Sequence, residues 1–373
     1  MKTVILGGYG NFGARICRAL ATRPGISVVV AGREGERAAR LAAELRGTAS
    51  WARIDANRPD FEAQLRSLDA GLVIHTAGPF QEQGYAVPLA VAAAGAHYID
   101  LADGRRFVCD FKHAADSAFR RQGKTAITGA STVPALSSAV VDAMTADWSE
   151  ILSIDFCIAP AQTAPRGIAT MAAVLAYCGT PIQVWEDGGW RTQYGWSRPQ
   201  RVHFQRMQPR RGSLCDIPDL ELFPGRYPGV QSVMFRAALE IGLSQSALAF
   251  MAGLRRIGLI RRPARYAKIF LRAADALNPL GSALGGMVVR VVGRNAEGAP
   301  VHSAWHIVAD DDHGPEIPCM ASILLAERLA NGEPFEPGAH VSAGWLSLAD
   351  FAPEFARWKM VTDVVHEGVT HGA

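Results

Sequence analysis

The segment that decides the fold runs from Val4 to Gly13 and reads VILGGYGNFG. An apolar run typical of a buried strand leads directly into a Gly-x-Gly-x-x-Gly turn, whose glycines are Gly8, Gly10 and Gly13. Such a turn lets the backbone approach a pyrophosphate, and a helix expected over Ala14–Ala21 would direct its N–H groups and positive dipole end at that anion. The segment predicts a dinucleotide-binding turn.

The neighbouring sequence favours this interpretation over a glycine turn without a ligand. Pro24 and Gly25 end the expected helix, and a second apolar strand is expected over Ile26–Ala31. Within the turn, we predict that six residues contact the cofactor: Gly8, Tyr9, Gly10, Asn11, Phe12 and Gly13.

The end of the second strand indicates which dinucleotide binds. An NAD site places an acidic residue on the ribose about 20 residues after the glycines, whereas this chain has Arg33 there. A guanidinium can hold a 2′-phosphate through two parallel hydrogen bonds, so we predict NADP(H) as the cofactor, with Arg37 as a second phosphate contact. The alternative is that Arg33 is solvated and that Glu34 or Glu36 binds the ribose.

Strands and helices continue to alternate as far as Thr128, which predicts an α/β fold with a doubly wound parallel Rossmann sheet of six strands. Ligands of such sheets bind at the carboxyl ends of the strands. Further cofactor contacts are therefore predicted just after the third and fourth strands, at Asp55, Thr76, Ala77, Gly78, Pro79 and Phe80. The loops after Asp100 and Thr128 should help to frame the nicotinamide.

The chain has 373 residues, 49% of them hydrophobic and 20% charged, which fits a globular protein of two domains, or of one domain with a large insertion. A net charge of +3 is too small to argue for a nucleic-acid partner. The six dispersed cysteines form no C-x-x-C pair and no His stands at metal-ligand spacing, so no metal site or disulfide framework is indicated. The first strand leaves no room for a signal peptide, and we predict a cytoplasmic protein.

From about Glu150 the pattern changes to strand-like segments, which predict an α+β domain with a largely antiparallel sheet. A strand is expected over Ile151–Phe156, and a hairpin over Met287–Val292 and Val301–Val308. We predict a Rossmann domain over residues 1–133, a substrate and dimerisation domain over 134–312, and a C-terminal helix and tail over 313–373 that pack back on the Rossmann domain.

Residues 237–276 are mostly helical and apolar, with arginines clustered near the middle. No run of about 20 uncharged apolar residues occurs, so a transmembrane helix is not predicted. Two interpretations stay open. The segment is a helical hairpin at a subunit interface, or it is a basic amphipathic surface that contacts a membrane or covers an oily substrate.

Five blocks of sequence together resemble the saccharopine dehydrogenase-like family: Gly7–Gly13, Ala31–Arg33, Ala77–Phe80, Ala94–Asp100 and Ala130–Pro134. Two later blocks extend the resemblance toward the C-terminus, Gly285–Val289 and Asp312–Pro318. The resemblance implies an NAD(P)-dependent oxidoreductase, some of whose relatives form or break C–N bonds of opine-like amino acids by reducing an imine. The family's substrate residues differ among branches, so no catalytic base is transferred.

Hydride transfer requires the hydride donor, the acceptor and a proton source to be held in line. Asp103 is the preferred polar residue of the pocket, and Tyr98 is a second catalytic candidate. His97 is interpreted mainly as a structural contact, and Asp100 either faces the pocket or caps the next helix. Other candidates are Arg105, Arg106 and Arg166 for an acidic substrate, Tyr194, Trp196, His203, Trp305 and His306 as walls, and His313 and Glu316 in the C-terminal block.

Three functions follow as hypotheses. The leading one is NADP(H)-dependent hydride transfer to or from an imine or amino-acid-like small molecule. The second is reduction of a carbonyl or conjugated alkene on a lipid-like substrate, and the third is an NADP-binding sensor or scaffold without catalysis. A homodimer is expected by analogy with related folds.

Overall fold

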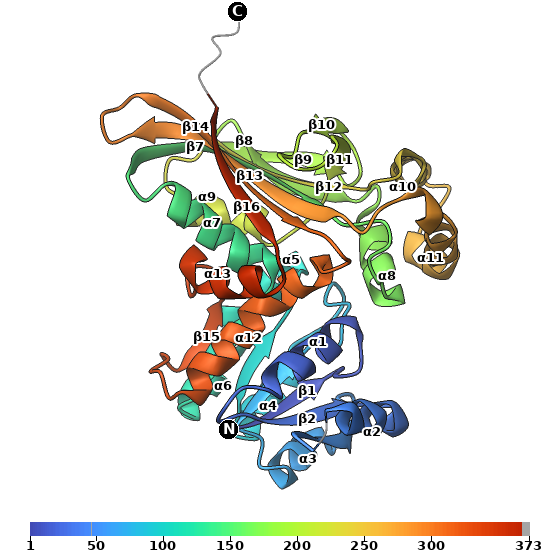
Figure 1. Ribbon diagram of the computed structural model, residues 1–373, viewed down its shortest axis with the longest axis vertical. Helices are drawn as coiled ribbons and strands as arrows, with labels where there is room; N and C mark the ends of the chain where they lie inside the picture. The colour runs from blue at the N-terminus through green and yellow to red at the C-terminus, as the bar shows by residue number, and fades with distance from the viewer. Residues whose placement is uncertain (46, 368–373) are drawn as a thin grey trace, which may run out of the picture. The chain divides into compact units, whose positions relative to one another are not determined.

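A computed structural model of the chain describes residues 1–45 and 47–367. These residues form two compact units, each with its own sheet (Figure 1). Among the described residues, the first unit comprises residues 1–136 and 315–346, and the second comprises residues 137–314 and 347–367.

The first unit is a seven-stranded sheet in the order β15-β6-β5-β4-β1-β2-β3, in which every neighbouring pair is parallel. The predicted doubly wound Rossmann sheet is thereby confirmed. Its strands are β1 (Lys2–Leu6), β2 (Ser27–Gly32), β3 (Ala49–Arg53), β4 (Leu72–His75), β5 (His97–Asp100), β6 (Thr125–Thr128) and β15 (Gly338–Val341).

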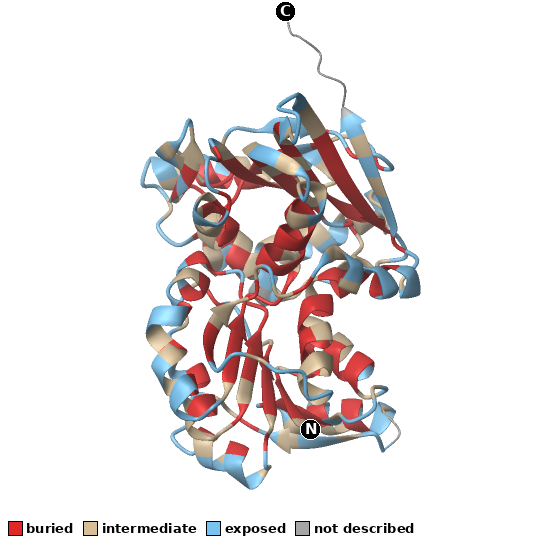
Figure 2. Cartoon of the chain, turned by 90° about the vertical axis from the view of Figure 1, so that its left-hand side faces the viewer, coloured by how far each residue is buried: buried red, intermediate tan, exposed pale blue. Residues whose placement is uncertain are grey.

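The helices of the first unit connect these strands. They are α1 (Asn11–Leu20), α2 (Gly35–Glu44), α3 (Phe61–Ser67), α4 (Ala86–Ala93), α5 (Arg105–Cys109), α6 (Phe111–Arg121) and α12 (Ile317–Ala330). The central strands are buried on both faces because helices cover both, and Figure 2 shows them as nearly continuous buried ribbons. α1 is amphipathic and turns Ile16, Cys17 and Leu20 inward.

The seventh strand, β15, is absent from the sequence prediction. It pairs with β6, and the Ala339 N–H donates to the Asp116 carboxylate of α6 at 3.0 Å. The preceding helix α12 packs on α1, where Arg15 pairs with Glu316 at 2.9 Å and Arg23 with Glu327 at 2.6 Å. The C-terminal segment thus extends the Rossmann sheet at one edge.

The second unit contains a mixed sheet with the strand order β10-β11-β12-β7-β13-β14-β16, to which β8 and β9 attach beside β12. Only β7 and β12 run parallel in it. Its strands are β7 (Trp148–Ala159), β8 (Pro181–Glu186), β9 (Gly189–Tyr194), β10 (Gln200–Val202), β11 (Arg210–Leu214), β12 (Ser232–Ala238), β13 (Gly285–Asn295), β14 (Pro300–Ala309) and β16 (Val361–Glu367).

The helices of the second unit cover one face of this sheet and one end of it (Figure 1). They are α7 (Ser137–Met144), α8 (Ile168–Tyr177), α9 (Asp219–Arg226), α10 (Gly242–Arg256), α11 (Ala267–Ala276) and α13 (Leu348–Arg357). Phe156 of β7 packs on Phe223 of α9, and Trp305 of β14 packs on Phe355 of α13. These contacts form the core between the sheet and its helices.

The predicted hairpin is confirmed as β13 and β14, which pair over ten residues from Gly285–Ala309 to Arg294–Pro300. The predicted tail differs from the structure. Only residues 315–346 join the Rossmann unit, whereas α13 and β16 belong to the second unit because β16 pairs with β14. Between β5 and β6 the chain forms two helices, since α5 ends at Cys109 and α6 begins at Phe111.

Candidate functional site

The first unit changes its winding direction at β1, which lies between β4 and β2. Strands placed later in the chain continue on the β4 side, and β2 and β3 lie on the other side. In open α/β sheets this switch point creates a crevice at the carboxyl ends of the strands, where ligands bind. The glycine turn after β1 lies at this point.

Backbone contacts hold the glycine turn in a tight conformation. The Gly8 N–H donates to the Ala31 carbonyl at 3.0 Å, and the Gly10 N–H donates to the Gly7 carbonyl at 2.8 Å. Gly7 has φ = +76°, which favours glycine. A Cβ on Gly13 would collide with the Gly7 carbonyl oxygen and lie 2.8 Å from the Thr76 hydroxyl, so only glycine lets α1 approach the turn this closely.

The N-terminus of α1 has the features of an anion-binding site. Its first turn holds no acidic side chain, and its N-cap, Gly10, makes no capping side-chain bond. Two of the predicted contacts also have structural partners within this unit: the Asn11 side chain accepts from Arg15 at 2.7 Å, and the Phe12 carbonyl lies 3.7 Å from the Cys319 thiol. The N-terminal dipole of a ten-residue helix therefore faces the crevice without a competing carboxylate.

Tyr9 lies over the end of β2. A Cβ on Gly32 would fall on the Tyr9 ring, and the Tyr9 hydroxyl accepts the Glu34 N–H at 2.9 Å. The Arg37 guanidinium lies 4.7 Å from the centre of the same ring and 3.2 Å from the Glu34 carboxylate. The sequence predicts Tyr9 as part of the turn but carries no local signal of this stacking, because it depends on the return of β2 beside β1.

Arg33 is exposed at the same strand end. Within residues 1–45 and 47–367 its guanidinium has no ion pair or hydrogen bond, whereas Glu34 is engaged by Arg37. Asp55, the predicted contact after β3, is half-buried, and its carboxylate accepts the Asn57 N–H at 3.1 Å, which closes the local turn. A direct cofactor contact by Asp55 stays a prediction.

The loop after β4 is held against the glycine turn. The Thr76 hydroxyl donates to the Leu6 carbonyl at 2.8 Å, and the Gln83 side chain donates to the carbonyls of Ala77 and Pro79 at 2.8 and 2.9 Å. Ala77, Gly78 and Pro79 are exposed beside the turn. They present small side chains where a flat ring could lie.

Two predicted site residues turn away from the crevice. The Phe80 ring is buried between His75 and Phe107, at centroid distances of 5.0 and 5.3 Å. Tyr98 is fully buried, its ring stacked on Phe111 and its hydroxyl 3.0 Å from His75 Nδ1. The prediction of a catalytic Tyr98 is therefore corrected: it is a core residue whose polar tip is satisfied internally.

Asp100 is a buried carboxylate that ties two strand-end loops together. Its Oδ1 accepts the Ala102 N–H at 2.9 Å, the Thr128 hydroxyl at 2.9 Å and the Gly129 N–H at 2.8 Å. Burial raises its pKa to about 6 although these three donors lower it. Asp100 was expected either to face the pocket or to cap the next helix, but its contacts instead brace the loops that follow β5 and β6.

Asp103 lies on the same loop and remains accessible to solvent. The Gln81 side-chain amide, from the loop after β4, donates to its carboxylate at 2.9 Å. The surrounding protein nevertheless raises the pKa of the Asp103 carboxyl above its usual range, and the Gln81 contact only partly offsets this effect. An accessible acid with a raised pKa at a strand end is a reasonable proton donor.

The other candidates do not form a second cluster. His97 accepts the Thr125 N–H at 3.1 Å, and burial lowers its pKa to about 4, in keeping with a structural contact. Glu316 pairs with Arg15, and Arg166 donates to the Asn278 side chain at 2.8 Å. Arg105 is buried, and Arg106 lies 3.5 Å from Asp110.

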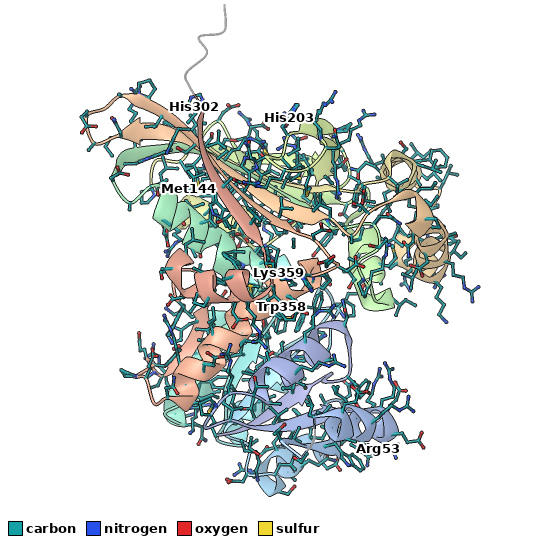
Figure 3. The ribbon with its side chains drawn as sticks, in the orientation of Figure 1. Arg53, Met144, His203, His302, Trp358 and Lys359 are labelled. Carbon is teal, nitrogen blue, oxygen red and sulfur yellow. The ribbon has the colours of Figure 1, made fainter. Side chains whose placement is uncertain are left out.

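The proposed wall residues of the second unit are dispersed. Trp305 and Trp196 are core residues, and the buried His306 accepts the Gln205 N–H at 3.2 Å. His203 is exposed and lies far from Trp358, which contacts the His313 ring at 4.9 Å (Figure 3). Tyr194 lies under the Arg256 guanidinium at 4.2 Å.

The residues at the switch point fit a dinucleotide. The close approaches at Gly7 and Gly13 leave a backbone cradle that a Cβ would fill, next to a helix start without acidic side chains. An unengaged guanidinium stands at the end of β2, where the ribose of a dinucleotide lies in this fold. Among the described residues, no group of three His, Cys, Asp or Glu side chains is arranged to hold a metal ion.

Fold and family match together define the first unit as a dinucleotide-binding Rossmann domain. Residues 3–132 match the family model described as the saccharopine dehydrogenase NADP binding domain, which confirms the resemblance and the NADP prediction. The first unit is thus an NADP-binding domain of the saccharopine dehydrogenase type. None of the curated proteins compared with the sequence matches it.

Solved structures share the fold of the whole chain. Apo saccharopine dehydrogenase (L-Glu forming) from Saccharomyces cerevisiae has a TM-score of 0.72 and 12% sequence identity, and the alignment covers 98% of this chain and 100% of that one. Homospermidine synthase from Legionella pneumophila, in complex with NAD, has a TM-score of 0.60 and 11% identity, with 100% and 93% coverage. At these identities the likeness concerns the fold.

Proposed function

We propose that this protein transfers a hydride between NADP(H) and an imine or amino-acid-like substrate. The observation that carries the proposal is the match of residues 3–132 to the saccharopine dehydrogenase NADP binding domain, on a chain of which 98% aligns with the fold of saccharopine dehydrogenase. The similar structures include enzymes named for saccharopine and homospermidine, which supports an amine-bearing substrate.

The chain's own residues have distinct roles in this proposal. The turn Gly8–Gly13 and the start of α1 bind the pyrophosphate, and Arg33 and Arg37 bind the 2′-phosphate. Ala77–Pro79 form one side of the nicotinamide site, and the bound cofactor supplies the hydride. Asp103 holds a proton on its carboxyl and delivers it to the substrate nitrogen as the C=N bond is reduced. Asp100 positions the loop that carries Asp103.

A lipid-like carbonyl or alkene substrate is the second candidate. It is favoured by one observation, the exposure of large apolar side chains on α10 and α11 of the second unit. A substrate with an acyl chain would be delivered more readily to an enzyme with such a surface.

The test is NADPH consumption over two panels, one of keto acids mixed with amines and one of enones and acyl ketones. Turnover confined to the first panel supports the leading proposal, and turnover confined to the second supports the lipid-like substrate. Tight NADPH binding without turnover on either panel would contradict both and indicate a sensor. Asp103→Asn should lower kcat by about 10²–10⁴-fold while NADPH affinity stays the same.

We further propose a cytoplasmic homodimer that binds a small molecule and no nucleic acid. All six cysteines are free thiols, as a reducing compartment requires. Sedimentation velocity at two protein concentrations measures the oligomeric state, and a monomer at both would contradict the dimer.

A further inference from the structure

One line of apolar side chains runs along the outer surface of α10. Leu243 and Phe250 of α10 and Ile257, the residue that follows its last turn, are spaced seven residues apart, as on one helix face, and their exposed fractions are 69%, 68% and 70%. Side chains of this size are rarely exposed in such a row. The row therefore needs an explanation beyond the fold of the second unit.

The opposite face of α10 already supplies the packing of this helix. Leu248, Met251 and Ala252 are buried in a cluster with Leu175 and Cys178, at and just after the end of α8. α10 is thus apolar on both faces, but only one is used internally. The outer row contributes little to folding and is available to a partner.

Further large apolar side chains are exposed in the segment that follows α10. Leu259, in the turn that follows α10, is 71% exposed, and Ile269 of α11 is 64% exposed. α10 and α11 lie next to each other at one end of the second sheet (Figure 1). We refer to Leu243, Phe250, Ile257, Leu259 and Ile269 as the apolar row.

The same segment carries a concentrated positive charge. Residues 241–280 contain seven Arg or Lys and one acidic residue, Asp275, a net charge of +6. The whole chain has a net charge of +3, so the remaining residues total −3. The basic residues are Arg255, Arg256, Arg261, Arg262, Arg265, Lys268 and Arg272.

Two of these cations have internal roles and five do not. Arg255 donates to the Ala176 carbonyl at 2.7 Å, and Arg256 stacks on Tyr194. Among the residues that the structure describes, the other five are exposed and pair with no carboxylate: Arg261, Arg262, Arg265, Lys268 and Arg272. Asp275 lies 3.8 Å from Arg166 and does not neutralise them.

We propose that the apolar row and its basic residues bind the surface of an anionic membrane. Apolar side chains inserted at the headgroup boundary and arginines paired with lipid phosphates are the two features of interfacial helices. No helix in the described part of the chain is long and apolar enough to span a membrane, so the segment would lie in the plane of the interface.

The net charge of residues 241–280 indicates which of two partners covers the apolar row, an anionic membrane or a second copy of the chain. A two-fold interface over α10 and α11 would bring two segments of net charge +6 together. Like charges across an interface oppose association, whereas a surface rich in acidic lipids attracts the basic residues of this segment. The proposal does not depend on the enzymatic reaction.

Co-sedimentation of the full-length protein with vesicles tests the proposal. The protein should pellet with vesicles of phosphatidylcholine containing about one-third phosphatidylglycerol, stay in solution with pure phosphatidylcholine, and be released by 0.5 M salt. Phe250→Glu, or the pair Arg261→Glu and Arg265→Glu, should each weaken binding by about tenfold or more.

Matched controls make the test specific. Val364→Glu places a charge on an exposed apolar residue of β16, and the pair Lys112→Glu and Arg121→Glu reverses two exposed cations of α6. Both controls should bind vesicles like the unchanged protein. Circular dichroism and NADPH binding verify that each variant is folded.

Three results would overturn the proposal. The first is absence of binding to anionic vesicles, and the second is binding that Phe250→Glu leaves unchanged. The third is a dimer in solution that Phe250→Glu converts to a monomer, which would assign the apolar row to an interface between copies.

Discussion

At the residue scale, the end of β2 is where cofactor choice is made. Arg33 is exposed and has no partner among residues 1–45 and 47–367, whereas Glu34 is paired with Arg37 and its N–H is held by Tyr9. The acidic residue that would bind a free ribose 2′-hydroxyl is therefore partly neutralised. The unengaged guanidinium has the chemistry to bind a 2′-phosphate.

Replacing Arg33 with Ala should lower NADPH affinity by about 1.5–3 kcal/mol, the range for a hydrogen bond to a charged group. NADH affinity should stay nearly constant, because NADH has no 2′-phosphate. Fluorescence titration with both nucleotides measures the change. Equal losses for the two nucleotides, or loss of preference only in Glu34→Gln, would contradict the role of Arg33.

A second residue of interest is Asp219, which is fully buried and hydrogen-bonded to the Ser137 hydroxyl. Burial raises the pKa of this carboxyl from 3.8 to about 7. The folded protein therefore holds this proton to a higher pH than the unfolded chain does. The stability that Asp219 contributes is present below pH 4 and is lost as the pH rises to about 7.

Asp219→Asn should remove this pH dependence. Relative to the variant, the unchanged protein should lose about 2–3 kcal/mol of unfolding free energy between pH 5 and pH 8. Urea denaturation at the two pH values measures it, with the exposed Asp147→Asn as control. A difference between the two proteins that is independent of pH would contradict the assignment.

At the scale of elements, the site depends on how closely α1 approaches the turn after β1. The atoms that a side chain on Gly13 would meet include the Gly7 carbonyl oxygen and the Gly8 Cα, and backbone atoms cannot move aside cheaply. The same position lies 2.8 Å from the Thr76 hydroxyl after β4. One glycine thus sets the spacing of three elements.

Gly13→Ala should cost about 1–3 kcal/mol of unfolding free energy and reduce NADPH affinity by about tenfold, since α1 must shift. Gly84→Ala is the control, because nothing lies within 4 Å of a Cβ at that position. Thermal denaturation and NADPH titration give the two quantities. Normal NADPH affinity in Gly13→Ala would show that the close approach is not needed for binding.

At the scale of the whole molecule, the chain leaves and re-enters each unit. The first unit takes its seventh strand from residues 338–341, and the second takes its last strand from residues 361–367. All the predicted cofactor contacts lie in the first unit. Cofactor binding should therefore stabilise one unit directly.

Calorimetry should show two unfolding transitions, of which NADPH raises one. At 100 times its Kd, NADPH adds about 2.7 kcal/mol to the stability of its unit, which for a unit of this size corresponds to about 5–10 °C. Hydrogen exchange should assign the shifted transition to residues 1–136 and 315–346. An equal shift of both transitions would contradict independent units.

Much of the Rossmann unit was predictable because its signals are local. The glycine turn, the alternation of strands and helices, and Arg33 are all read within a few residues of one another, and the structure places them at one switch point. The hairpin of β13 and β14 was also predicted, since a short turn joins two alternating strands.

By itself the sequence determined the class of fold, the dinucleotide turn and the preference for NADP(H), because short-range spacing dictates each of them. Only the tertiary structure decided that Phe80 and Tyr98 face the core and that Asp100 braces two loops. It also decided where β15 and β16 pair. Those outcomes depend on which distant strands become neighbours, and long-range pairing leaves little local signal in the residues that take part.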